Sequence, residues 1–457
     1  MENVTRTIAR FTRHLQYEDL SSDAINLAKR FLLDSIGCAF GGSKTEDVHI
    51  MLDFFNDMGG TTESTVINSK KRLPMINACL LNSLMIRALD YNDIYWEQDP
   101  SHPSDLIPAV LTPAETLGKS GKDLIVAIVL AYEWEQRLCE FAIPGIRERK
   151  WHHATLTQFA SPLVAGKILD LDEDQLVHAI GISASHNLTL GAVTAGKLTM
   201  MKNTVDPLAT QAGLFAALLA KRGYEGPEHV MDGKEGLTDT LGGRFDLNIL
   251  TDGLGESFRI TRCSMKAFPT EALTHSPISA VIKLMKSHHL KKENIDHVLI
   301  RTVARAADIL SDPSKYDPRT RETADHSLPY CIAATIVDGT VTPGSFKEEK
   351  IMDPEIRSFL PKIKVVADVE IEKTFPALKR TAVEITTRTG QKHDLVVDYP
   401  LGDYREPMDD ETFYSKFDSM VLSAVSRKKR DQIVEMVLQL EKVSNTADLM
   451  KLLARLS

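Results

Sequence analysis

Four short segments of the sequence combine a histidine or lysine with the predicted first turn of a helix. A helix N-terminus offers unpaired backbone N–H groups and a partial positive charge, so a carboxylate can bind there beside a cationic side chain. Four such segments together predict a site for a small polyanionic substrate, on the hypothesis that they converge in space. The segments are His102-Pro103-Ser104-Asp105, Lys202-Asn203-Thr204, Lys266-Ala-Phe-Pro-Thr-Glu271 and Asp325-His326-Ser327-Leu-Pro-Tyr330.

Each segment also has a simpler interpretation. In the first, Pro103 favours an extended His102, and Ser104 is predicted to cap a helix that runs to Leu117. Taken singly, a lysine before a helix is most often a solvated surface residue, and His-Pro is more often a turn than a catalyst. Tyr330 lies on an apolar helix face, which by itself predicts a core residue. Only a pattern that joins the segments favours the functional interpretation.

Sequence signatures of other chemistries are missing. No complete phosphate loop, dinucleotide fingerprint, nucleophile elbow or HExxH motif occurs in the sequence. The five cysteines form no CxxC pair, which argues against an iron–sulfur or zinc site and predicts buried thiols. The adjacent histidines at 152–153 and 288–289 cannot face one ion from a regular helix, so we expect no metal ion.

Composition narrows the class of protein further. The chain has 457 residues, 43% of them hydrophobic, and a formal net charge of −9, which disfavours nucleic acids and acidic membrane surfaces as partners. Charged residues interrupt the apolar runs well before the ~20 residues that a membrane span requires. The N-terminus lacks the apolar stretch of a signal peptide. We therefore expect a soluble, cytoplasmic protein.

The period of the apolar residues predicts a mainly α protein with two domains. Up to about residue 250 the apolar residues recur every three or four positions, as in the stripe from Ala24 to Ile36, which follows Ser21-Ser22-Asp23 as candidate N-cap residues. Alternating β-branched runs at 295–303, 362–369, 381–387 and 393–399 predict strands, with helices near 270–287 and 327–338. The helical period returns after about residue 405. The predicted layout is a helical domain, 1–258 plus 405–457, with an inserted α+β lid domain, 259–404.

The four segments belong to one larger pattern of motifs. In chain order these are Ala28-Lys-Arg-Phe-Leu-Leu-Asp-Ser-Ile-Gly-Cys-Ala-Phe-Gly-Gly42, Asp90-Tyr-Asn-Asp93, His102-Pro-Ser-Asp105, Lys202, Lys266-Ala-Phe-Pro269 and Ala324-Asp-His-Ser-Leu-Pro-Tyr330. In these motifs and their order the chain resembles the MmgE/PrpD family, which contains 2-methylcitrate dehydratases and cis-aconitate decarboxylases. The resemblance covers nearly the whole chain.

The resemblance implies a large helical domain, a smaller lid domain, a homodimer and a cofactor-free active site between the domains. It also implies that Asp90, His102, His153, Lys202, Lys266 and Tyr330 line the active site. From their chemistry we assign them the following roles. His102 is the leading general acid or base, and Asp90 orients it or takes the second proton role. Lys202 and Lys266 bind carboxylates, and Tyr330 or His153 serves the leaving hydroxyl. Substrate-binding roles are expected for Asn92, Ser104, His152 and His326.

The wording of two motifs places the chain nearer the dehydratases. His102-Pro-Ser-Asp105 and the 324–330 motif match them, whereas decarboxylases more often have glycine after the serine. Two departures are Ile94, where many relatives have threonine, and His152, where dehydratases can have aspartate. The expected activity is dehydration of 2-methylcitrate or a citrate-like tricarboxylate. The alternatives are decarboxylation of cis-aconitate, epimerisation of a related dicarboxylate, and a non-catalytic anion-binding scaffold.

Overall fold

The computed structural model describes residues 3–195 and 198–455. The chain divides into two compact units, each with its own close packing. The larger one, called the helical unit, contains Met1–Ala88, Asn92–Cys263 and Asp410–Ser457. The smaller one, called the mixed unit, contains Leu89–Tyr91 and Ser264–Asp409.

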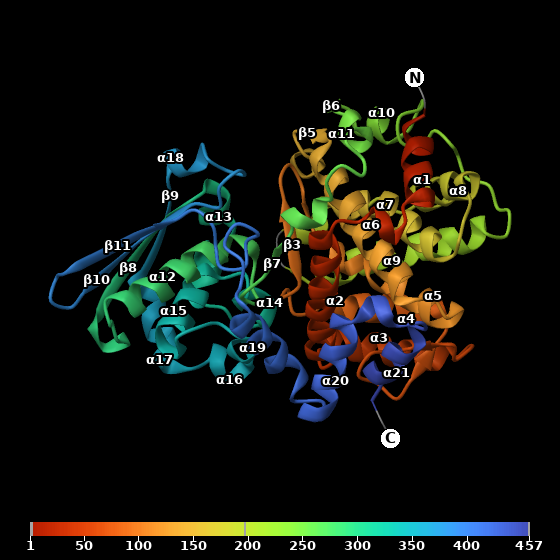
Figure 1. Cartoon of the computed structure of the whole chain (residues 1–457). Helices are drawn as coiled ribbons and strands as arrows, with labels where there is room; N and C mark the ends of the chain where they lie inside the picture. Colours follow the sequence, from red (N-terminus) through yellow and green to blue (C-terminus); the bar gives the residue numbers. More distant parts are fainter. Residues whose placement is uncertain (1–2, 196–197, 456–457) are drawn as a thin grey trace. The chain divides into compact units, whose positions relative to one another are not determined.

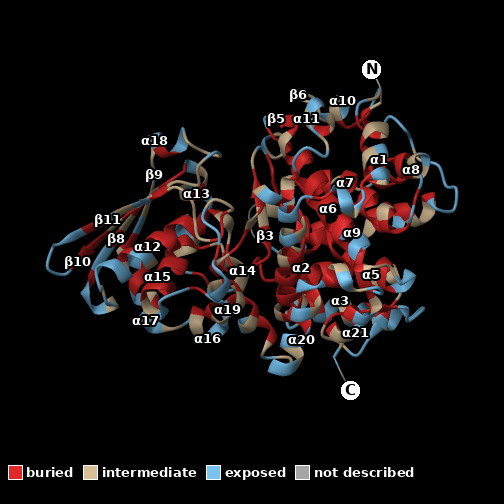
Figure 2. Cartoon of the chain, viewed as in Figure 1, coloured by how far each residue is buried: buried red, intermediate tan, exposed pale blue. Residues whose placement is uncertain are grey.

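The helical unit consists mostly of α-helices, as the period of its apolar residues predicts (Figure 1). Helices α6 and α7 are buried along nearly all of their length (Figure 2). Helices α7 and α9 approach so closely that a Cβ at Gly213 would lie 2.0 Å from the hydroxyl oxygen of Ser161, so only glycine fits there. The main helices are α1 Val4–His14, α2 Ser22–Gly42, α3 Glu46–Met58, α4 Met75–Arg87, α5 Pro108–Leu117, α6 Gly121–Glu140, α7 Ala154–Ile168, α8 Glu173–Ala184, α9 Met201–Ala220, α19 Asp410–Val421, α20 Arg427–Leu438 and α21 Ala447–Leu453.

The predicted helix starts are partly right. Ser21 caps α2, because its hydroxyl accepts a hydrogen bond of 3.2 Å from the Ala24 N–H, which confirms the N-cap prediction. The prediction that Ser104 caps a helix is wrong. Ser104 lies in the 3₁₀ turn Pro103–Leu106, where its N–H and hydroxyl both donate to the Asp93 carboxylate, and α5 begins only at Pro108. Ser104 therefore hydrogen-bonds to the Asp93 carboxylate instead of capping the helix.

The start of α9 also differs from the prediction. The helix begins at Met201, so Lys202 lies inside its first turn rather than in a loop before it. Pro207 sits in the second turn rather than the opening one, although proline cannot donate a hydrogen bond to the carbonyl of residue 203. This shift places Lys202 and Asp206, four residues apart, on one face of the helix.

The mixed unit contains a four-stranded sheet at the positions that the alternating runs predict. The strand order is β11-β10-β8-β9, in which only the β8–β9 pair is parallel. Gly390, with a positive φ of 84°, allows the tight turn between β10 and β11. Helix α12 packs against β10 and β11, and α15 packs against α12 (Figure 1). The strands are β8 Ile295–Thr302, β9 Ile363–Ala367, β10 Thr381–Thr387 and β11 Lys392–Val397, and the two helices are α12 His275–Ser287 and α15 Leu328–Asp338.

The helices and strands confirm a mainly α fold. A lid role for the mixed unit stays a prediction. Within residues 3–195 and 198–455, no helix combines the length and the apolar character that a membrane crossing requires.

Candidate active site

His102 is held in a defined orientation in the helical unit. It follows the short hairpin of β3 Asp93–Trp96 and β4 Pro100–Ser101, and the residue is only 7% exposed. Its Nδ1 lies 2.6 Å from the backbone carbonyl oxygen of Asp93. A carbonyl oxygen can only accept, so Nδ1 carries the hydrogen and Nε2 is the basic nitrogen of the neutral ring. The backbone thus fixes the tautomer that a general base needs.

A buried network supports the loop that carries His102. The Asn92 amide donates to the Ser104 hydroxyl at 2.9 Å and to the Asp105 carboxyl at 3.0 Å. The Asp93 carboxyl accepts from both the N–H and the hydroxyl of Ser104, and burial raises the pKa of Asp93 to about 6. In the structure Asn92 and Ser104 therefore hold this loop, and their role in substrate binding stays a prediction.

One arginine and two carboxyl groups lie beside this loop. Arg87, at the end of α4, has its Nε 3.6 Å from Asp105 Oδ2 and 4.0 Å from Asp206 Oδ2, and all three residues are buried. Burial raises the pKa of Asp105 well above its ordinary value, even though Arg87 lowers it. Burial also opposes ionisation of Asp206, but the nearby His153, His152 and Arg87 bring its pKa below the ordinary value. Asp206 is therefore the anionic member of the pair.

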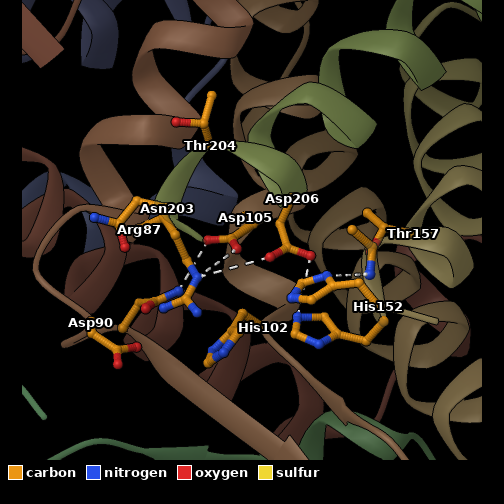
Figure 3. Close-up of polar contacts among 12 residues, drawn as sticks. Arg87, Asp90, His102, Asp105, His152, Thr157, Asn203, Thr204 and Asp206 are labelled. Atoms are coloured by element: carbon orange, nitrogen blue, oxygen red, sulfur yellow. Dashed lines mark hydrogen bonds and ion pairs between the residues drawn. The ribbon is translucent and has the colours of Figure 1, made fainter. Parts of the chain in front are cut away.

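The two adjacent histidines lie at the start of α7. His153 is the N-cap residue, and its Nε2 lies 3.3 Å from Asp206 Oδ1. The rings of His152 and His153 stack with centroids 4.0 Å apart, and the His102 ring is 5.8 Å from that of His153. Burial, followed by the charge of His153, lowers the pKa of His152 well below its ordinary value, so His152 is neutral. Figure 3 shows Asp206 between Arg87 on one side and His152 on the other.

Lys202 is buried in the first turn of α9, one turn before Asp206. Part of the predicted site therefore lies within the helical unit. Arg87 and Asp206 also belong to this site, but neither was predicted from the sequence. The signal for Asp206 was its spacing of four residues from Lys202 on a helix, and Arg87 was a charged residue at the end of a strongly apolar helix. The predicted residues that lie in this unit are His102, His152, His153, Lys202, Asn92 and Ser104.

A second group of predicted residues lies in the mixed unit. Lys266 Nζ is 2.7 Å from Asp90 Oδ1 and 3.2 Å from the Thr270 carbonyl oxygen, and both charged side chains are nearly completely buried. Asp90 has a positive φ of 50°, a strained conformation that aspartate tolerates better than most residues. Burial raises the pKa of Glu271, which also interacts electrostatically with His326, Lys266 and Asp90. Lys266, Asp90, Glu271 and His326 thus form one electrostatic cluster.

Tyr330 occupies a different environment in the mixed unit. Ser327 caps α15, because its hydroxyl accepts a hydrogen bond of 3.0 Å from the Tyr330 N–H. The Tyr330 side chain is fully buried, and its hydroxyl donates to the Ser345 carbonyl at 2.5 Å. His326 instead pairs with Asp325 at 2.5 Å between Nδ1 and Oδ1. In this structure Tyr330 is a core residue, as the simpler interpretation predicts, and its catalytic role stays a prediction.

Comparison with known proteins agrees with the motif pattern. The MmgE/PrpD N-terminal domain matches residues 6–250, and the MmgE/PrpD C-terminal domain matches residues 268–442. The chain is 26% identical to cis-aconitate decarboxylase from Mus musculus, over 99% of this chain and 94% of that protein. It is 25% identical to cis-aconitate decarboxylase from Aspergillus terreus (strain NIH 2624 / FGSC A1156), over 98% and 96%.

A dehydratase is similar over a shorter stretch. The chain is 23% identical to 2-methylcitrate dehydratase from Escherichia coli (strain K12), over 86% of this chain and 85% of that protein. Identity is therefore slightly higher, and coverage greater, for the two decarboxylases than for this dehydratase. The two domain matches together cover most of the sequence, and the chain therefore belongs to the MmgE/PrpD family.

Proposed function

We propose that the protein is a lyase that acts on a citrate- or aconitate-type tricarboxylate by general acid–base catalysis, with 2-methylcitrate as the first candidate substrate. The observation that carries this proposal is the orientation of His102. Its Nδ1–H is held by a backbone carbonyl, which directs the basic Nε2 to proton transfer.

In the dehydration that we propose, each group has one task. His102 Nε2 removes a proton from the carbon next to a carboxylate, and the electron pair of that C–H bond forms the new C=C bond. The C–O bond to the hydroxyl breaks, and His153 supplies the proton with which the hydroxyl leaves as water. Lys202 balances a substrate carboxylate, and Lys266, beside Asp90, is assigned the same task.

Decarboxylation of cis-aconitate is the second candidate. It is favoured by the greater coverage and slightly higher identity of the decarboxylases from Mus musculus and Aspergillus terreus. In that reaction a C–C bond breaks, carbon dioxide leaves, and an imidazolium protonates the carbon that receives the electron pair. The same histidines and cations serve both reactions, so the products decide between them.

The test is to incubate the purified protein with 2-methylcitrate, citrate and cis-aconitate separately, with chelator present, and to follow the products by proton NMR. A new unsaturated tricarboxylate formed from 2-methylcitrate or citrate supports the dehydratase. Itaconate formed from cis-aconitate supports the decarboxylase instead. Turnover of none of the three would refute the proposed substrate class.

We also propose that the protein is a homodimer, as the family resemblance implies. Support comes from an apolar groove along α9 and the loop before it. Its lining includes Leu190, Met201, Leu208 and Phe215, which are 61%, 45%, 37% and 43% exposed. Large apolar side chains gathered on one face are typical of a protein–protein contact.

A further inference from the structure

Helix geometry does not exclude a metal ion at the His152–His153 pair. Adjacent side chains diverge in this way only where both residues lie inside a regular helix. In the structure the first residue of α7 is Ala154, so both histidines precede the helix. One ligand atom from each of His152, His153 and Asp206 falls within 4.8 Å of the other two. The helix geometry behind the expectation of no metal ion therefore does not apply to these two imidazoles.

The spacing within this cluster suits a metal ion better than a direct hydrogen bond. His153 Nε2 and Asp206 Oδ1 are 3.3 Å apart, longer than a charge-assisted hydrogen bond of about 2.8 Å. Zinc bonds of about 2.0–2.1 Å at a tetrahedral angle separate two ligand atoms by about 3.3 Å. The His153–Asp206 edge thus already has the length of a tetrahedral edge, and a ligand atom of His152 lies within 4.8 Å of both.

Several polar atoms of the cluster are buried without an aligned hydrogen bond. Among the described residues, neither ring nitrogen of His153 has such a partner, and the same is true of Asp206 Oδ2. Both side chains are more than nine-tenths buried. Buried polar atoms normally have partners, so their arrangement around one point indicates a ligand.

The ligand set also suits a cation. Asp206 supplies a carboxylate oxygen, and His152 and His153 each supply a ring nitrogen. Two imidazoles and one carboxylate are a ligand set typical of zinc and related ions. Three protein ligands leave one coordination position for water or for a carboxylate of a small molecule.

We propose that His152, His153 and Asp206 form a binding site for a divalent transition-metal ion of the zinc type, and that the bound ion inhibits the enzyme. The inhibition rests on the proposed function, in which His153 donates a proton to the leaving hydroxyl. A metal ion bound to the same ring nitrogen occupies the lone pair that would carry this proton. The binding site itself does not depend on the proposed function. Metal and proton compete for the same atom.

Metal binding is tested first, with the metal alone. The chelator-treated, desalted protein is titrated with Co²⁺ and followed by its visible absorption, and Zn²⁺ affinity is measured by competition with a chromogenic chelator. His152→Gln and Asp206→Asn each remove one ligand, and their circular dichroism is compared with that of the wild type. His288→Gln is the matched control, because His288 also stacks on a second histidine, at 4.1 Å, but belongs to no three-ligand cluster among the described residues.

We expect one saturable equivalent of metal in the wild type and in His288→Gln. Affinity should fall at least about 10-fold in each ligand variant, since even residues that only support ligands contribute 10- to 100-fold. Two results would overturn the site: no saturable binding to the wild type, or a folded His152→Gln that binds as tightly as the wild type. If Asp206→Asn does not fold, His152→Gln alone decides.

Inhibition is tested on the substrate that the NMR assay identifies. We expect turnover to fall with the same midpoint as the binding titration and to return when chelator is added. Turnover that is unchanged or increased at full occupancy would overturn the inhibitory role. If no tricarboxylate is turned over, the proposed function fails while the binding titration still decides the site.

Discussion

Glu135 makes the stability of the helical unit depend on pH in a way that can be calculated. This side chain of α6 is fully buried, accepts one hydrogen bond of 2.7 Å from the Thr157 hydroxyl, and has no arginine or lysine paired with it among the ion pairs of the described residues. Burial raises its pKa from 4.5 to about 8. Between these two values the unfolded chain is ionised at this position while the folded chain still holds the proton.

The sign and size of the effect follow from proton linkage. In this interval the native state binds one more proton than the unfolded state, so the free energy of unfolding falls by about 1.4 kcal/mol per pH unit. The full contribution is present below pH 4.5 and is lost by about pH 8, which amounts to about 5 kcal/mol. Glu135→Gln keeps a hydrogen-bond acceptor for Thr157 but does not titrate. The free energy of unfolding of this variant should therefore not fall in this way as the pH rises. At pH 9 the free energy of unfolding of Glu135→Gln should therefore exceed that of the wild type by up to about 5 kcal/mol.

The assay is urea unfolding at several pH values, followed by tryptophan fluorescence. All three tryptophans, Trp96, Trp134 and Trp151, belong to the helical unit, so fluorescence reports on that unit alone. The matched control is Glu133→Gln on the same helix. Glu133 is also buried, but it accepts from Arg137 at 2.5 Å and from the Arg259 N–H at 2.7 Å.

The control should behave in the opposite way. Removal of the Glu133 charge leaves the buried Arg137 guanidinium uncompensated, which should destabilise the unit by about 3–5 kcal/mol at neutral pH. Parallel stability profiles for the wild type and Glu135→Gln from pH 5 to pH 9 would refute the assignment of this pH dependence to Glu135. A stabilised Glu133→Gln would refute the role given to charge pairing.

Two further predictions concern the mixed unit and the oligomer. Lys266→Met removes the ammonium group 2.7 Å from the Asp90 carboxyl and should lower the stability of the mixed unit by about 3–5 kcal/mol, measured by urea unfolding with far-ultraviolet circular dichroism. Adding Asp90→Asn should restore part of the loss, and equal losses in the single and double variants would contradict a direct pairing. Phe215→Glu should shift the protein from dimer to monomer, measured by light scattering after size-exclusion chromatography. Ile50→Glu is the control, because Ile50 is similarly exposed. A Phe215→Glu variant that remains a dimer would exclude the α9 groove as the contact.

Local patterns in the sequence were sufficient to predict most of the elements. The alternating run that starts at Ile295 became β8, because a strand with one buried face needs a period of two. Ser21 caps its helix because only the local backbone competes for its hydroxyl. Ser104 does not, because Asp93 reaches it from eleven residues away, a contact that spacing alone does not show.

The arrangement around Asp206 could not be predicted for the same reason. Arg87, Asp105 and His153 come from different helices and loops, and only tertiary packing brings them to one carboxylate. For His152 and His153, helix geometry was used to argue against a metal ion. That geometry does not hold here, because both residues lie just outside the helix.

The most direct test of the central claim compares the wild type with His102→Ala in one measurement. Each protein is incubated with 2-methylcitrate, citrate or cis-aconitate in the presence of chelator, and proton NMR records the products over time. We predict turnover of at least one tricarboxylate by the wild type and a rate about 10²–10⁴ times lower for His102→Ala, the usual cost of a lost general acid or base. Equal rates for the two proteins, or no product from any of the three substrates, would contradict it.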